Sequence, residues 1–373
     1  MRQPPSLYVE STELSADSVE SHPLLPYTFA VSTYQVDQDT ETDAASPSYS
    51  RRGRCCLHRA VRDEDGLHCQ VLAAVSGAAI LDTKWCLAGS ANPEHALGLL
   101  GIADATGHIT LHRLEKATEL QFTTHDTWQM NGENALCLSL DWSDRAPFEE
   151  TCTRADARLI CSQSNGKLVT VPSVHAGTKN GIPLGLESWL AHEYESWIAA
   201  WDCWSNGAVV WSGGDDLALR GWDLRQPMHD GARPTTFSTT KCFQGGVTSI
   251  QSHAFRQHCW AVGSYDEKLR IFDARNTQRP VSETEVGGGI WRTKWHPTRP
   301  DTILLGCMHG GFQVLQDTQP AAEAMEVVCH FDAHNSIAYG CDWERGMLQT
   351  NPDEDLVYSC SFYDATLRVW AWA

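Results

Sequence analysis

Basic residues are scarce in this chain. Its 373 residues include 28 Lys and Arg against 47 Asp and Glu, which gives a formal net charge of −19. So strong a negative balance argues against electrostatic binding to nucleic acid or to an anionic membrane. A basic protein or a cationic substrate is a better-matched partner, although acidic residues also serve solubility alone.

Long apolar runs and targeting signals are missing as well. No apolar run approaches the ~20 residues of a membrane-spanning helix. The opening "MRQPPSLYVESTEL" lacks the basic start and apolar stretch of a secretion signal. The 14 Cys include the adjacent pair Cys55 and Cys56 but no CxxC spacing, so neither a zinc site nor any other metal is expected. Free thiols without a signal predict a reducing compartment, and we expect the cytoplasm.

Familiar catalytic motifs are also lacking. The chain has no G-x-S-x-G nucleophile elbow, no P-loop and no GxGxxG that follows a strand, and "HEYES" (192–196) fails the HExxH pattern at its last position. No cofactor is therefore expected. Motifs alone leave a non-catalytic scaffold for protein–protein assembly as an open alternative to an enzyme.

A repeated pattern accounts for the 15 Trp residues, a heavy load that requires either a repeated structural position or an aromatic surface. An alternating run ends in an aromatic residue, and a second run, a tight turn and a third run follow. Such alternation is typical of β-strands. The pattern recurs every ~40–60 residues, the spacing of a supersecondary repeat. The aromatic residues that end the first runs are Trp85, Trp142, Trp201, Phe255, Trp295 and Trp343.

The second and third runs are clearest at "VVWSGGDDLALRGWD" (209–223), "WAVGSYDEKLRIFD" (260–273) and "VYSCSFYDATLRVW" (357–370). Repeats of four short strands with a Trp-Asp signature resemble the WD-repeat β-propeller. This resemblance implies an all-β, seven-bladed WD-repeat β-propeller. The chain ends on a third strand, so an N-terminal strand near "SLYVES" (6–11) is expected to complete the last blade and close the ring.

We expect one domain over 1–373, with a mobile insertion at 37–54 because that stretch is polar and rich in turn formers. The blades are expected at roughly 12–72, 73–118, 119–180, 181–240, 241–283, 284–328 and 329–373.

The repeat directs several unusual residues to one face, where the second-to-third-strand turns and the links into the first strands lie. The residues expected around this mouth are His192, Glu195, Trp197, Tyr265, Trp291, His309, His334, Ser336 and Tyr363. In standard WD repeats a His before the first strand bonds to the turn Asp, which favours a structural role for His334 and Asp364. His309 stands where the turn Asp is expected and its copy lacks the partner His, so a functional role and a plain turn role both remain open.

Some segments are more particular than a generic propeller. "GGGIWRTKWHP" (287–297), "LLGCMHGGFQVL" (304–315), "HNSIAYGCDW" (334–343) and "YSCSFYDATLRVW" (358–370) resemble the diphthine methyl ester hydrolase family of diphthamide biosynthesis. The resemblance implies a carboxyl methylesterase. Its substrate would be a modified histidine on translation elongation factor 2, which carries a quaternary ammonium group and a methyl ester, and its product would be diphthine.

The implied reaction gives the mouth residues possible roles. Ester hydrolysis needs a nucleophile or activated water, a base and donors for the oxyanion. Ser336 could be the nucleophile with His309 or His334 as base, or His309 could activate water directly; the turns at 287–289 and 309–311 could donate N–H groups. The candidates for binding the substrate, which include aromatic faces for the ammonium group, are Trp197, Trp291, Tyr265, Tyr339, Tyr363 and Asp364. A monomer is expected.

Overall fold

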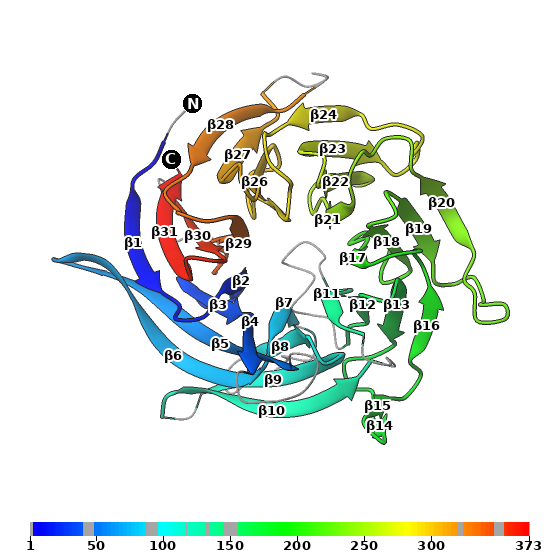
Figure 1. The fold of residues 1–373 in the computed structure, drawn as a ribbon, viewed down its shortest axis with the longest axis horizontal. Helices are drawn as coiled ribbons and strands as arrows, with labels where there is room; N and C mark the ends of the chain where they lie inside the picture. The colour runs from blue at the N-terminus through cyan, green and yellow to red at the C-terminus, as the bar shows by residue number, and fades with distance from the viewer. Residues whose placement is uncertain are drawn as a thin grey trace.

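The computed structural model describes residues 3–39, 48–86, 88, 96–116, 118–130, 135–144, 156–318, 324–346 and 354–372. Within these ranges the elements β1 to β31 are all β-strands. Seven sheets of four or five strands surround a common axis (Figure 1). The predicted seven-bladed propeller is confirmed. No helix in this part of the chain is long and apolar enough to cross a membrane.

The strands of the first three blades have the following bounds. The first blade contains β2 (Ala16–Ser21), β3 (Thr28–Thr33), β4 (Gln35–Asp39), β5 (Ser48–Asp63) and β6 (Gly66–Ala78), the second β7 (Ile80–Cys86), β8 (Ala96–Asp104), β9 (His108–Lys116) and β10 (Leu120–Gln129), and the third β11 (Cys137–Trp142), β12 (Leu159–Gln163), β13 (Lys167–Val171) and β16 (Glu187–Leu190). A separate small hairpin is formed by β14 (Thr178–Lys179) and β15 (Ile182–Pro183).

The other four blades each have four strands. The fourth contains β17 (Ser196–Trp201), β18 (Val209–Gly214), β19 (Leu219–Asp223) and β20 (Thr235–Thr239), the fifth β21 (Val247–Ser252), β22 (Cys259–Ser264), β23 (Lys268–Asp273) and β24 (Ser282–Glu285), the sixth β25 (Arg292–Trp295), β26 (Thr302–Gly306), β27 (Phe312–Gln316) and β28 (Glu326–Phe331), and the seventh β29 (Ala338–Trp343), β30 (Asp355–Ser361), β31 (Thr366–Trp372) and β1 (Ser6–Ser11).

The N-terminal strand closes the ring as predicted. β1 pairs antiparallel with β31, from Ser11 opposite Thr366 to Ser6 opposite Trp370. The first and last segments of the chain therefore lie side by side in one blade (Figure 1). This pairing covers the outer edge of β31 and joins the first segment of the chain to the last blade, which closes the ring.

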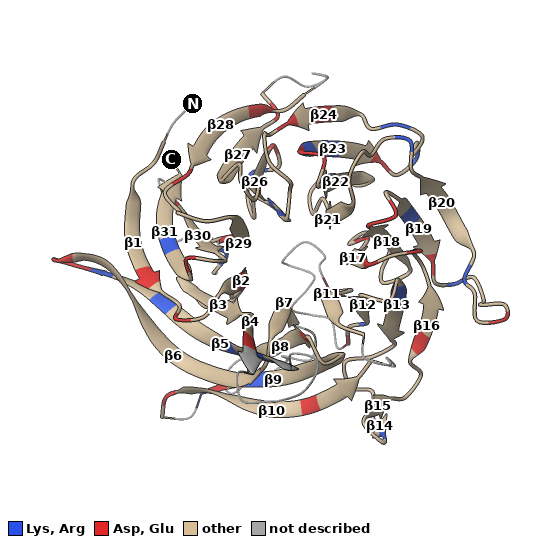
Figure 2. Cartoon of the chain, in the orientation of Figure 1, with Lys and Arg blue, Asp and Glu red and all other residues tan. Residues whose placement is uncertain are grey.

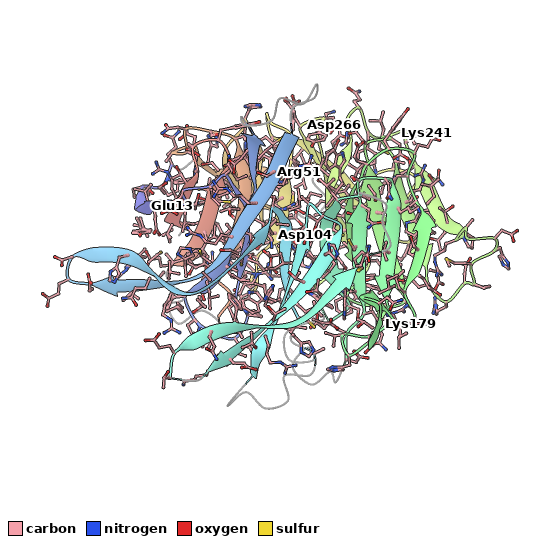
Figure 3. The ribbon with its side chains drawn as sticks, turned by 60° about the horizontal axis from the view of Figure 1, so that its bottom comes forward. Glu13, Arg51, Asp104, Lys179, Lys241 and Asp266 are labelled. Atoms are coloured by element: carbon pink, nitrogen blue, oxygen red, sulfur yellow. The ribbon has the colours of Figure 1, made fainter. Side chains whose placement is uncertain are left out.

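The first blade differs most from what the sequence predicts. β6 pairs with β5 as an additional strand, and the β5–β6 hairpin extends beyond the rest of the ring (Figure 3). The expected boundary at residue 72 falls inside β6. In the segment expected as an insertion, residues 37–39 belong to β4 and residues 48–54 to β5, while residues 40–47 lie outside the described residues; mobility of this segment stays a prediction.

Buried Trp residues join neighbouring blades. The indole N–H of Trp201 donates to the carbonyl of Asp141 over 3.1 Å, and that of Trp343 donates to the carbonyl of Lys294 over 2.9 Å. In both cases the acceptor belongs to the inner strand of the preceding blade. The Trp side chains are fully buried but their one polar group is satisfied, which removes the main cost of burying them.

Three histidines that directly follow inner strands strengthen this packing. His22, His253 and His296 lie 4.4, 4.3 and 4.6 Å (ring centroids) from Trp85, Trp295 and Trp343. The Nδ1 atom of His253 accepts the backbone N–H groups of Phe255 and Arg256, so this ring caps the turn that follows. Burial lowers the pKa of His22 and of His253 to about 4, which keeps both rings neutral.

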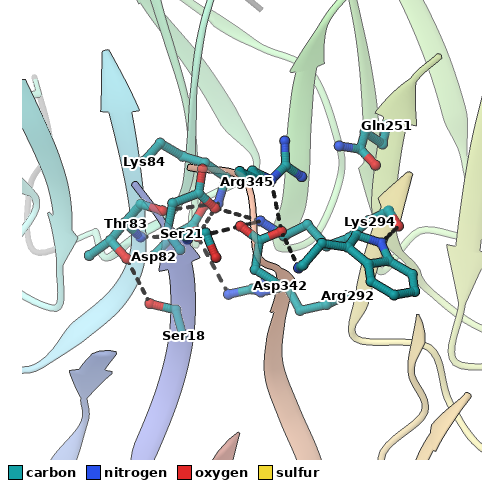
Figure 4. A network of polar contacts seen from close by, with 12 residues as sticks. Ser18, Ser21, Asp82, Thr83, Lys84, Gln251, Arg292, Lys294, Asp342 and Arg345 are labelled. Carbon is teal, nitrogen blue, oxygen red and sulfur yellow. Dashed lines mark hydrogen bonds and ion pairs between the residues drawn. The ribbon is translucent and has the colours of Figure 1, made fainter. Parts of the chain in front are cut away.

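Charge is spread around the whole ring rather than gathered on one side (Figure 2). The exception is a buried cluster between the inner strands, shown in Figure 4. There Lys294 of the sixth blade contacts Glu20 of the first at 2.5 Å, and Arg292 of the sixth donates to the carbonyl of Leu81 in the second at 3.2 Å. These contacts join blades that are not neighbours, so they pass across the axis of the propeller.

Candidate active site

The inner strands of the seven blades have corresponding positions near one end of the axis, and together these positions form a ring. In five blades the register of pairing between the first and second strands shifts at the second residue of the inner strand, which is the signature of a β-bulge. The shifts fall at Asp17, Leu81, Leu138, Trp197 and Thr248. The seventh blade shifts at Tyr339 and Gly340, and in the sixth Trp291 precedes the first residue of β25. Bulges re-aim side chains, and this level of the ring is where the sequence predicts a mouth.

Four aromatic side chains form a continuous arc at this level. The ring centroids of Trp197 and Trp291 lie 5.7 Å apart, and Tyr265 lies 6.0 Å from Trp197 and 6.2 Å from Trp291. Tyr339 continues the arc at 5.1 Å from Trp291. The arc therefore combines residues from the fourth, fifth, sixth and seventh blades, all of them half-buried. It unites four of the substrate-binding candidates that the sequence suggests.

Two further aromatic residues, which the sequence did not single out, extend the arc. Phe362 lies 5.0 Å from Tyr339, and Tyr34 of the first blade lies 6.2 Å from Phe362 (ring centroids). Tyr363, a predicted contact, touches the arc only through Phe362 at 5.1 Å and is 77% exposed. We place Tyr363 at the rim of the mouth rather than in the arc.

Carboxylates stand beside the arc. The indole N–H of Trp197 donates to Asp215 over 3.1 Å, which fixes the orientation of the ring. Burial, and then the charges of Asp215 and Glu195, raise the pKa of the Tyr265 hydroxyl, so it stays protonated. Carboxylates thus border the arc beside Trp197 and Tyr265, while the Arg292 guanidinium lies over the Trp291 ring, 5.5 Å from its centroid.

His334 is committed to a structural hydrogen-bond chain. The indole N–H of Trp370 donates to Ser359 (3.1 Å), and the His334 ring lies between Ser359 (Nε2, 2.9 Å) and Ser361 (Nδ1, 2.6 Å). Ser361 in turn donates to Asp364. With these donors and acceptors, the Ser359 hydroxyl donates to the Nε2 atom of His334, so the lone pair of that nitrogen is already used.

Neither His334 nor Asp364 is therefore available to a substrate in this arrangement. Burial, and then the nearby Arg368, lower the pKa of His334 to about 3. The fourth blade has the same design, with His192 between Asp216 and Ser212, each at 2.8 Å. This repetition supports the structural interpretation of both histidines.

His309 stands apart from any such chain. It is exposed, and its side chain makes no hydrogen bond or ion pair with another residue in the described ranges. Its turn is held against the seventh blade, because Met308 and Ala338 pair as an isolated bridge with N···O distances of 3.2 and 2.9 Å. Ala338 is the residue before Tyr339 of the arc. His309 therefore lies one residue from a backbone bridge that leads to the arc.

Ser336 lies two residues from the other side of the same bridge. Its Oγ accepts the backbone N–H of Tyr363 over 3.1 Å, and it is half-buried. Among the described residues, no histidine nitrogen is within hydrogen-bonding distance of this Oγ. The structure thus brings the turn of His309 and the loop of Ser336 together without forming a serine–histidine pair.

The glycine-rich segment 287–289 fills the space between the arc and the His309 turn. A Cβ on Gly289 would lie 3.2 Å from the Met308 sulfur and 3.3 Å from Tyr265, and one on Gly288 would clash with the carbonyl of Cys307. Gly310 donates its N–H to that carbonyl over 2.6 Å, and Gly311 donates to Met308, so these two amides already have partners. Of the amides suggested by the sequence, those of residues 287–289 and of His309 therefore remain as oxyanion donors.

Asp17 is the residue of this ring that sequence reasoning missed. Its side chain is 2% exposed, and its Oδ2 atom has no hydrogen-bond partner in the described part of the chain. Burial, opposed by the charge of Arg292, raises its pKa to about 7. The only signal in the sequence was its position as the second residue of the first strand in a repeat. Trp197 and Tyr339 occupy the same position in their own blades.

A metal centre is not formed by the residues that the structure describes, because no three His, Cys, Asp or Glu side chains among them come together as ligands. The polar groups near the arc therefore include Asp17, Asp215, Glu195, His309, Ser336 and backbone amides.

Comparison with known proteins connects this arrangement to a family. No protein-family model matches the chain. The chain is 37% identical over 358 residues to diphthine methyltransferase of Homo sapiens, an alignment that covers 91% of this chain and 74% of the human one. The chain belongs to the diphthine methyltransferase family.

Other members of the diphthine methyltransferase family match over similar lengths. The mouse protein is 36% identical, with 90% of this chain and 69% of the mouse chain covered, and the Dictyostelium discoideum homolog is 31% identical, with 96% of each covered. Among solved structures, a chain of the mitotic checkpoint complex has a TM-score of 0.64 at 14% identity and covers 100% of this chain and 94% of its own length. That likeness shows the propeller fold alone.

Proposed function

We propose that this protein is a carboxyl methylesterase that hydrolyses the methyl ester of diphthine methyl ester on translation elongation factor 2 and leaves diphthine. The observation that carries the proposal is the arc of Trp197, Tyr265, Trp291 and Tyr339, drawn from four blades and bordered by carboxylates. The family relationship supports it, because the relatives are named for an activity on diphthine.

The arc suits the quaternary ammonium group of that substrate. Such a group has no N–H to donate, so it binds through electrostatic attraction to aromatic faces and to carboxylates. Each aromatic contact contributes about 0.5–2 kcal/mol of binding free energy. In this substrate the ester is attached to the carbon that bears the ammonium group. Binding the cation in the arc therefore holds the ester next to it, within reach of the 287–289 amides and of the loops that carry His309 and Ser336.

The reaction needs one water molecule. In the mechanism that we propose, His309 accepts a proton from this water as its oxygen attacks the ester carbonyl carbon. The tetrahedral oxyanion is stabilised by backbone N–H groups of residues 287–289. It then collapses, the C–O bond to the methoxy group breaks, and His309 returns the proton so that methanol leaves; the carboxylic acid that remains loses its proton to solvent and becomes the carboxylate.

Water attack fits the described geometry better than a serine nucleophile does. The Ser336 Oγ accepts the Tyr363 N–H, and its neighbour His334 is held between Ser359 and Ser361. Activation of Ser336 would require His309 to reach it directly. A serine mechanism therefore remains the second candidate, and a Ser336→Ala variant decides between the two.

The family name describes a methyl transfer, whereas hydrolysis removes a methyl group. We favour hydrolysis because the sequence lacks the glycine-rich loop after a strand by which many enzymes bind nucleotide cofactors. The two reactions shift the mass of the modified peptide in opposite directions. Purified protein is incubated with methyl-esterified elongation factor 2, with and without S-adenosylmethionine, and the peptide is weighed by mass spectrometry.

We expect the loss of one methylene mass in both incubations, with release of methanol. A gain of mass that requires S-adenosylmethionine would establish a transferase instead. No change at high protein concentration with a verified substrate would favour a non-catalytic scaffold. The partner follows from the same proposal: a chain with a net charge of −19 attracts a basic surface around the modified histidine. We also propose that the protein acts in the cytoplasm as a monomer.

A further inference from the structure

One carboxylate interrupts an otherwise uncharged ring of side chains. The seven positions at the level of the bulges are Asp17, Leu81, Leu138, Trp197, Thr248, Trp291 and Tyr339. The hydroxyl of Thr248 is already used, since it donates to the carbonyl of Ile290. Asp17 is therefore the only charged group in this ring, and it follows Tyr339 in the neighbouring blade.

Two buried polar atoms at this level lack partners. The Asp17 Oδ2 and the Trp291 Nε1 are both inaccessible to solvent and unbonded within the described residues. Buried polar groups are nearly always satisfied, so the charge of an unpaired carboxylate oxygen at this level is not compensated by a hydrogen bond from the described residues. The charge of Asp17 also reaches the arc, because burial and then that charge raise the pKa of Tyr339.

The groups that face Asp17 come from four strands. Arg292 of β25 and Lys84 of β7 attract its charge, Asp82 of β7 repels it, and Tyr339 of β29 and Cys360 of β30 contribute uncharged side chains. Lys84 and Arg292 are themselves bound to Asp82, at 2.7 and 3.6 Å. Asp17 thus retains a negative charge that its neighbours only partly offset.

We infer that Asp17 selects the esterified form of the substrate over the carboxylate product. The inference rests on the proposed function, since it concerns the same site. The ester form carries one positive charge, which the arc and Asp17 both attract. Hydrolysis places a new carboxylate on the carbon next to the ammonium group, and this carboxylate is repelled by Asp17 at short range. Asp17 therefore favours substrate binding and promotes product release.

Small probes test this without any turnover. Glycine betaine amide carries the trimethylammonium group beside an uncharged carbonyl, as the ester does, and glycine betaine carries it beside a carboxylate. We expect the wild-type protein to bind the amide at least about tenfold more tightly than betaine, measured by Trp fluorescence or calorimetry. Asp17→Asn should bring the two affinities within about twofold of each other. An unchanged preference in a folded Asp17→Asn variant would overturn the inference.

Two controls separate charge selection from other effects. Asp317→Asn removes a carboxylate that pairs with Arg256 at the other end of the blades, at 3.0 Å, and should leave the preference unchanged. Trp291→Ala should weaken both probes together. If neither probe binds the wild type, the cation site itself is wrong. If the probes bind as expected but the esterified factor is not hydrolysed, the proposed function fails while the cation site stands.

A measurement on the wild-type protein at two pH values tests the inference even if Asp17→Asn misfolds. Because burial raises the pKa of Asp17 to about 7, lowering the pH from about 8 to about 6 neutralises it in the free protein. Betaine keeps its carboxylate in this range. The preference for the amide should therefore shrink in the wild type at the lower pH and stay small in Asp17→Asn at both. A wild-type preference that does not change with pH would contradict the inference.

Discussion

Met308 and Ala338 exchange two backbone hydrogen bonds, of 3.2 and 2.9 Å, across the boundary between the sixth and the seventh blade. The bridge fixes a tight turn to an inner strand that belongs to another sheet. His309 follows on one side of it and Tyr339 on the other. The proposed base on the turn and the proposed cation-binding ring are thus held in register by main-chain atoms, and side-chain substitutions at either position should leave that register intact.

Replacement of His309 should abolish turnover without affecting the fold. His309→Ala removes the proposed base, which contributes ~10²–10⁴-fold to such reactions. The side chain is exposed and bonded to no described residue, so the melting temperature should be unchanged. The assay is ester hydrolysis followed by mass spectrometry. The equally exposed His229 in the fourth blade provides a matched control, His229→Ala, that should keep full activity. A fully active His309→Ala variant would reject this base.

Replacement of Ser336 decides whether an acyl-enzyme forms. With water as the nucleophile, Ser336→Ala should lose less than about tenfold of the rate, because only the hydrogen bond to the Tyr363 N–H is removed. Acid quenching of the wild-type enzyme during turnover should then yield unmodified protein. A covalent adduct on the peptide that contains Ser336, together with an inactive alanine variant, would establish the serine mechanism.

Replacement of Trp291 should raise KM more than it lowers kcat. Trp291 is the centre of the arc and contacts Trp197, Tyr265 and Tyr339. Its loss should weaken binding of the ammonium group by ~3–30-fold, the equivalent of one aromatic contact or slightly more. Trp291→Phe keeps an aromatic face and should recover most of the affinity. Equal affinities of the alanine and phenylalanine variants would show that the ring does not bind the cation.

Loss of His334 should cost stability, and the cost should depend on pH. His334→Ala leaves Ser359 and Ser361 without their shared partner, which we expect to lower the free energy of unfolding by about 2 kcal/mol. The folded-state pKa of about 3 lies below the ordinary value near 6.5. The neutral ring therefore stabilises the fold fully above about pH 6.5, and this contribution is lost progressively as the pH falls towards 3. Urea unfolding at several pH values should show a smaller difference between variant and wild type at the acidic end.

Removal of the closing strand should destabilise the whole ring. A chain that starts after Ser11 lacks β1, so the outer edge of β31 loses its partner from Thr366 to Trp370. The seven blades depend on closure for cooperativity, and we expect the melting temperature to fall by many degrees or the protein to aggregate through the exposed edge. Adding the peptide that corresponds to residues 3–11 should restore part of the stability. A truncated chain with unchanged melting behaviour would contradict closure by β1.

The architecture was accessible from the sequence because its signals repeat. Four of the five Trp residues that end an inner strand donate to a carbonyl of the preceding blade, and Trp85 is the exception, so the same residue type recurs at a regular spacing. The closing strand followed by elimination, since the last blade lacked a fourth strand. By contrast, β6 has no counterpart in the other blades, so the repeat gave no reason to add a strand to the first one.

The site was only partly accessible for a related reason. The repeat directed Trp197, Tyr265, Trp291 and Tyr339 to one face, and contact between them followed. Asp17 was not predicted because its position depends on a β-bulge that turns this residue towards the axis. A bulge is a local shift in strand pairing, which the amino-acid composition does not reveal. His334 was suggested both as a base and as a structural residue; only the directed bonds through Ser359 and Ser361 favour the second role.

The contacts across the axis have a consequence for how a protein substrate can be used. Arg292 reaches Leu81, and Lys294 reaches Glu20, between blades that lie on different sides of the axis (Figure 4). Arg292 directly follows Trp291 of the arc, and Lys294 lies two residues further along β25, so these bonds connect the arc to the first and second blades. A protein substrate that displaces Trp291 on binding should therefore also disturb β2, the strand of the first blade that carries both Glu20 and Asp17.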